Sequence, residues 1–123
     1  MIRLLADGNL SRRFVAACLR LRADFPIIHL ADWMGGRHRM SKDPVLLSVL
    51  REAGLVLVSF DRRTMALHAS QLSRAASGHA GVILFRRSVS QLDYGKQSRL
   101  LVAFWQEAAQ WEWADRIEYL PSS

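Results

Sequence analysis

Cysteine is almost absent from this sequence of 123 residues, and its scarcity excludes an internal disulfide bond. The single thiol, Cys18, shares a predicted helix face with Phe14 and Leu21, so we expect it to be buried and unreactive. A chain without a disulfide framework is typical of a reducing compartment. We therefore expect a cytoplasmic protein.

Long hydrophobic runs are also missing. No apolar stretch approaches the ~20 residues that a membrane-spanning helix needs. Asp7 interrupts the N-terminal apolar stretch before any signal-peptide cleavage site, so we expect neither a signal peptide nor membrane association. No glycine-rich phosphate-binding motif occurs, and no two histidines have the spacing of a zinc site. Nothing in the sequence thus favours a membrane protein, a nucleotide-dependent enzyme or a zinc protein.

Positive charge, by contrast, is abundant. The formal net charge is +6, and residues 1–106 hold 16 Lys and Arg against 7 Asp and Glu. A basic body of this kind suits a polyanionic partner such as RNA. The alternative is an ordinary solvated basic surface, and charge alone does not decide between them.

Apolar runs typical of strands alternate with amphipathic segments typical of helices along the whole chain. This order predicts one domain, residues 1–123, folded as a three-layer α/β/α sandwich with a five-stranded, mainly parallel sheet. We expect Ser11, Asp43 and Ser90 to begin helices. The predicted strands are 2–6, 26–30, 55–60, 81–85 and 117–120, and the predicted helices are 12–21, 43–53, 62–77 and 90–108.

Carboxylates follow two of the predicted strands and stand at the start of one helix. Asp7 ends the first strand, Asp61 ends the third, and Asp43 precedes a proline at the second helix start. Because parallel strands place their carboxyl ends at one sheet edge, we expect these acids to form a site for Mg²⁺ or Mn²⁺. Each also has a structural alternative, since Asp43 and Asp61 could simply cap helices. Asp32 is a fourth and weaker candidate.

Arginine pairs follow the third and fourth predicted strands, at the same expected edge. These pairs, 62–63 and 86–87, are candidates to bind substrate phosphates next to the cleaved one, or they face solvent. The loop 33–39 mixes Trp33 with basic residues and could stack on unpaired bases, although such a tryptophan is more often a packing anchor. An aromatic-rich C-terminal region, 105–119, is expected to be mostly core, with a homodimer surface as a further possibility.

Three short motifs together resemble the PIN-like domains of small bacterial proteins, which are related to the ribonuclease toxins of VapC type. They are Leu-Leu-Ala-Asp-Gly-Asn-Leu-Ser at 4–11, Ser-Lys-Asp-Pro-Val-Leu-Leu at 41–47, and Leu-Val-Leu-Val-Ser-Phe-Asp-Arg-Arg at 55–63. The resemblance covers most of the chain. It implies a five-stranded parallel sheet, a Mg²⁺- or Mn²⁺-dependent endoribonuclease site and a small antitoxin partner. On motif match, Asp7, Asp43 and Asp61 would be catalytic and metal-binding, while Asn9 would orient the first of them and face the substrate.

The chain departs from this family pattern at Gly8. Relatives commonly carry a glutamate after the first aspartate, so the acid cluster here lacks one carboxylate. We therefore expect weaker metal binding and reduced activity.

Our leading hypothesis is a metal-dependent endoribonuclease of a toxin–antitoxin system, impaired by Gly8. The main alternative is a catalytically weak or inactive module of the same fold that binds RNA or an antitoxin protein. A phospho-accepting receiver is disfavoured, because one acid rather than two follows the first strand and no lysine follows the fifth.

Overall fold

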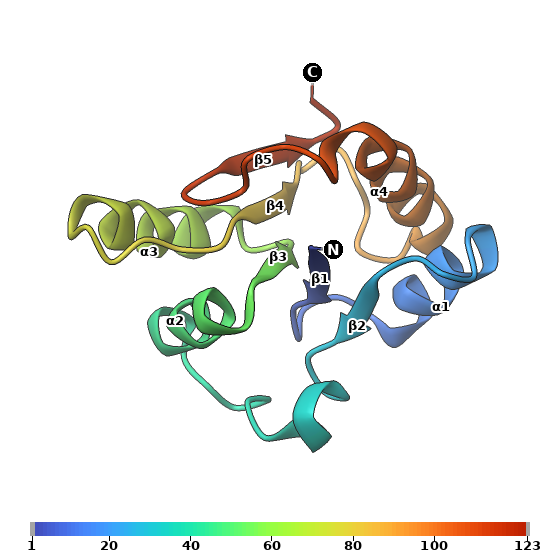
Figure 1. Cartoon of the computed structure of the whole chain (residues 1–123). Coiled ribbons are helices and arrows are strands. Elements are labelled where there is room, and N and C mark those ends of the chain that lie inside the picture. Colours follow the sequence, from blue (N-terminus) through green and yellow to red (C-terminus); the bar gives the residue numbers. More distant parts are fainter. Residues whose placement is uncertain (1, 123) are drawn as a thin grey trace.

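A computed structural model describes residues 2–122 of the chain (Figure 1). Five strands form one sheet in the order β2-β1-β3-β4-β5, and every neighbouring pair is parallel. The elements in chain order are β1 (Arg3–Ala6), α1 (Arg12–Leu21), β2 (Ile27–His29), a short 3₁₀ helix η1 (Trp33–Gly36), α2 (Asp43–Ala53), β3 (Leu55–Ser59), α3 (Arg62–Arg74), β4 (Val82–Phe85), α4 (Tyr94–Ala108) and β5 (Ile117–Leu120). The predicted α/β class is confirmed, and the sheet is wholly rather than mainly parallel.

Helices cover both faces of the sheet, as the near-continuous apolar strands require. Figure 1 shows α1 and α4 together on one side of the sheet and α2 and α3 on the other. The central strand β3 is buried along its whole length. These layers are the predicted α/β/α sandwich.

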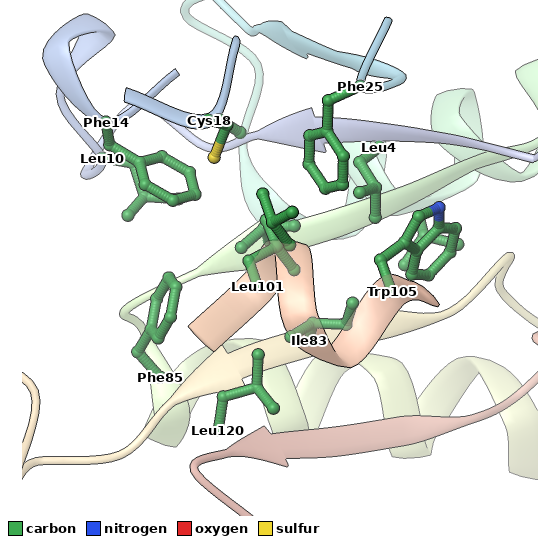
Figure 2. Close-up of a cluster of buried hydrophobic side chains, with 14 of the residues drawn as sticks. Leu4, Leu10, Phe14, Cys18, Phe25, Ile83, Phe85, Leu101, Trp105 and Leu120 are labelled. Atoms are coloured by element: carbon green, nitrogen blue, oxygen red, sulfur yellow. The ribbon is translucent and has the colours of Figure 1, made fainter. Parts of the chain in front are cut away.

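The first core lies between the sheet and the α1–α4 layer (Figure 2). Phe14 and Cys18 of α1 meet Leu101 and Trp105 of α4 above the strands, and all four side chains are buried. Burial raises the pKa of the Cys18 thiol to about 12, so the thiol stays protonated and unreactive, as predicted. Leu21 was predicted on the same buried helix face, but it lies at the end of α1 and about half of its surface is exposed.

The second core lies on the opposite face, beneath α2 and α3. Leu46 and Leu50 of α2 and Met65 of α3 pack there against the strands. Trp33 of η1 joins this core and is almost fully buried, which makes it a packing anchor rather than a base-stacking surface. The loop around it is thereby fixed at the carboxyl end of β2.

One predicted helix start and one predicted helix cap are wrong. Helix α4 begins at Tyr94, where the Asp93 carboxylate accepts from the Lys96 N–H, and Ser90 instead lies in the preceding turn. As a consequence Leu92 is outside the helix and 78% exposed. Lys42, not Asp43, occupies the N-cap position of α2, and Asp43 is the first helical residue.

Within residues 2–122, no helix is both long enough and apolar enough to cross a membrane.

Candidate functional site

The candidate site lies at the carboxyl edge of the sheet, where β1 and β3 end side by side. The crossover from β1 to β2 goes to one side of β1, while β3 pairs on the other side. The strand order therefore reverses between β1 and β3. In doubly wound sheets, ligands bind in the crevice outside such a switch point. Asp7 follows β1 directly, and Asp61 lies two residues after the end of β3.

Asp7 is held firmly in the crevice. Its backbone N–H extends the ladder by donating to Val58 O at 2.9 Å. One carboxylate oxygen accepts from the Gly8 N–H at 2.7 Å, and the other accepts from the Ser59 hydroxyl at 2.9 Å. The residue is only 9% exposed. A fixed, nearly buried carboxylate at a strand end has a defined orientation toward any ligand in the crevice.

Ser59 is a functional residue that sequence reasoning missed. Its fully buried hydroxyl donates to Asp7, and its oxygen accepts from the Asp61 N–H at 3.0 Å. One side chain thus ties the ends of β1 and β3 together and sets the spacing of two candidate acids. The available signal was a single polar residue at the end of an otherwise apolar strand.

Asn9 completes this network from the turn after β1. Its side-chain amide donates to the Ser59 hydroxyl at 3.0 Å and, more weakly, to Asp7 at 3.4 Å. Its side-chain carbonyl accepts from the Phe60 N–H at 3.1 Å. These contacts place Asn9 beside the first acid, where the resemblance put it, and they make it a support for the strand ends.

The electrostatics of the site are unfavourable for its own acids. Burial raises the pKa of Asp7 even though the Ser59 hydroxyl and the Gly8 N–H both stabilise its charged form. The nearby charge of Asp61 raises that pKa further. The fold therefore places the Asp7 carboxyl where its ionised form is less stable than in water.

Asp43 reaches the same edge from α2. Because Lys42 takes the cap position, the Asp43 carboxylate makes no capping hydrogen bond, which overturns a purely capping role. Burial raises the pKa of Asp43, and the charges of Asp7 and Asp61 raise it further. The three carboxylates are thus near enough for their charges to interact. That they form one metal site stays a prediction.

Asp61 has two roles at once. Its Oδ1 accepts from the Thr64 N–H at 3.0 Å and so caps α3, as its structural alternative proposed. Its charge still acts on Asp7 and Asp43. Asp32, the weaker candidate, is engaged elsewhere, since it pairs with Arg12 at 2.7 Å on an exposed surface.

The four arginines beyond β3 and β4 separate into two kinds. Arg62 donates to Phe85 O at 3.0 Å, and Arg86 donates to the backbone carbonyls of Pro121 and Ser122. Arg63 and Arg87 are exposed and line an open hollow of about 620 Å³ that also borders on Asp61. Arg62 also lines this hollow, but its guanidinium group is engaged by a backbone carbonyl, whereas no hydrogen bond to a protein group is found for the Arg63 and Arg87 side chains among residues 2–122.

The chemistry of the acids fits a hard divalent cation, which prefers carboxylate oxygens and offsets like-charge repulsion. The number of acidic side chains that lie close together, however, is small. Among residues 2–122, no group of three or more His, Cys, Asp or Glu side chains is assembled closely enough to hold a metal ion by itself. Any ion at this edge would therefore depend on ligands from water or substrate as well as from the protein.

Gly8 stands at the open side of the site. Its φ lies outside the left-handed region, and a Cβ built there has no atom within 4 Å. A glutamate at this position, as the resemblance implied, is therefore not excluded by packing or by backbone strain.

Fold and site together define a doubly wound α/β domain with an acid cluster at its switch point. Comparisons of the chain with models of known protein families, with curated protein sequences and with solved structures find no match.

Proposed function

We propose that this protein is a Mg²⁺- or Mn²⁺-dependent endoribonuclease of a toxin–antitoxin system, with its activity reduced by Gly8. The observation that carries the proposal is the approach of Asp7, Asp43 and Asp61 at one sheet edge, where their charges act on one another. A fold gains nothing from such repulsion. A bound cation would remove it.

The roles of the side chains follow from their positions. Asp7 and Asp61 would hold the ion with help from Asp43, and Ser59 would keep the first two at a fixed separation. A bound divalent ion supplies water activation and charge neutralisation at the attacked phosphate. The exposed arginines beside Asp61 would bind the RNA backbone.

A second candidate function is a module of the same fold that binds RNA or an antitoxin protein without cleaving. The incomplete metal group and the absent acid at position 8 favour it. Cleavage must require a divalent ion, whereas RNA binding through arginines would survive EDTA. The resemblance also implies an antitoxin, and a cognate one would suppress cleavage.

The deciding experiment incubates the purified protein with single-stranded and structured RNA, in Mn²⁺ or in EDTA. The Asp7→Asn variant tests the site, and Asp32→Asn is its matched control because Asp32 is exposed and paired with Arg12. We expect cleavage in Mn²⁺ by the natural chain and by Asp32→Asn, with a loss of at least about a hundredfold in Asp7→Asn. RNA binding in EDTA without cleavage under any condition would favour the binding module instead.

A further inference from the structure

One arginine of each pair at the carboxyl edge, Arg62 and Arg86, donates hydrogen bonds to backbone carbonyls. Arg62 reaches from α3 to carbonyls at the ends of β3 and β4, with 3.5 Å to Phe60 O and 3.0 Å to Phe85 O. Arg86 reaches from β4 to the chain after β5 and lies 5.2 Å above the Tyr119 ring. Both guanidinium groups thus join the ends of neighbouring strands.

Arg63 and Arg87 line the hollow together with Arg62. Arg63 stands in the first turn of α3, Arg87 stands in the turn after β4, and both are exposed. The N-terminus of a 13-residue helix also points to this place, adding partial positive charge. Two exposed guanidinium groups at a helix N-terminus favour a phosphate group.

The hollow is continuous with the acid site, because Asp61 borders both. The hollow is open to solvent and has a volume of about 620 Å³. A chain whose reacting phosphate lies at the acids would place its next nucleotide here. A groove that follows a backbone with positive charge is typical of single-strand binding.

We propose that Arg63 and Arg87 bind the phosphate next to the cleaved one in a single-stranded RNA, while the guanidinium groups of Arg62 and Arg86 are engaged by backbone carbonyls at strand ends. The adjacency to a cleaved bond rests on the proposed nuclease function. The phosphate contact itself does not. The substrate must then continue at least one nucleotide past the cleaved bond on the side of the hollow.

The test measures binding of a fluorescent 12-nucleotide single-stranded RNA in EDTA, across a range of salt concentrations. All chains in this binding assay carry Asp7→Asn. The test variant also carries Arg63→Ala and Arg87→Ala. The matched control adds Arg20→Ala and Arg74→Ala, which remove the same charge from exposed positions at the far ends of α1 and α3.

We expect the Arg63/Arg87 variant to lose about tenfold or more in affinity and to lower the salt slope by about 0.7, the contribution of one phosphate contact to a single strand. The control should change the slope little. Lysine at both positions should preserve the slope. Arg62→Ala is expected instead to lower the melting temperature, because it removes contacts that join strand ends.

Cleavage assays with Asp7 restored provide the second readout. Loss of Arg63 and Arg87 should raise KM more than it lowers kcat, and the same RNA annealed into a duplex should bind worse than the single strand. Equal slopes for variant and control, or no RNA binding at all, would overturn the inference. A slope difference without any metal-dependent cleavage would overturn the nuclease function and leave the phosphate contact standing.

Discussion

The two edges of the sheet treat their acids in opposite ways. At the carboxyl edge, burial and neighbouring carboxylates raise the pKa values of Asp7 and Asp43. At the amino edge, the Ser73 hydroxyl donates to Asp115 at 2.7 Å and the His79 N–H donates at 3.2 Å, and the pKa of Asp115 is lowered. One edge thus stabilises its carboxylate, and the other leaves its carboxylates under repulsion.

This difference indicates which edge is structural. Asp115 joins the end of α3 to the turn before β5, and its charge is satisfied by the protein itself. The carboxyl-edge acids are kept in place by Ser59 although their own ionisation is unfavourable there. Strained electrostatics that a fold preserves are typical of sites that bind a charged ligand.

The largest effect is expected from breaking the network that holds the acids. Ser59→Ala removes the donor to Asp7 and the acceptor of the Asp61 N–H from a fully buried place. We expect about 1–3 kcal/mol lower stability, measured by urea unfolding. Metal-dependent cleavage should fall by about 10- to 100-fold, as for other groups that orient metal ligands.

Ser98→Ala is the matched control for this change. Ser98 is also buried, but its hydroxyl donates to Gly95 O within α4, away from the acids. The control should lose stability without a matching loss of activity per folded molecule. If both variants lose the same activity, the hydroxyl of Ser59 has only a structural role.

A smaller gain is expected from restoring the absent acid. Gly8→Glu adds a carboxylate where no atom lies within 4 Å of a new Cβ. We expect roughly tenfold tighter Mn²⁺ binding, because affinity for hard cations follows the number of charged ligands. The measurement is the increase in melting temperature on adding Mn²⁺, together with the rate of RNA cleavage.

Gly8→Gln controls for size and loss of glycine flexibility, since it has the same shape without the charge. A Mn²⁺ effect that is equal in the Glu and Gln variants would remove position 8 from the metal site.

The sequence predicted the layers of this fold well, because buried parallel strands and amphipathic helices leave clear periodic patterns. It also placed Asp7 and Asp61 at one edge, since parallel strands bring their ends together. The division of the arginines was not predictable, because the acceptors of Arg62 and Arg86 are carbonyls on other strands. The cap of α2 was predicted one residue late, because a carboxylate beside a proline fits both the cap and the first turn.

The finest test of the contrast between the edges is the dependence of stability on pH, measured by urea unfolding from below pH 3.8 to neutrality. Burial raises the folded pKa of Asp7 above its ordinary value of 3.8, so above that pH the folded chain keeps a proton that the unfolded chain has lost. Its contribution favours folding at low pH and is lost as the pH rises above 3.8. Asp115 has a lowered pKa, so its contribution is complete above 3.8 and is lost as the pH falls through the folded value.

Asparagine at each position removes the titration while keeping the side-chain shape. We therefore expect Asp7→Asn to gain stability over the natural chain as the pH rises above 3.8. Asp115→Asn should lose stability over the same change, and by less, because solvent screens an exposed carboxylate. Difference curves of the same sign would show that the two edges do not differ and would contradict a ligand site at the carboxyl edge.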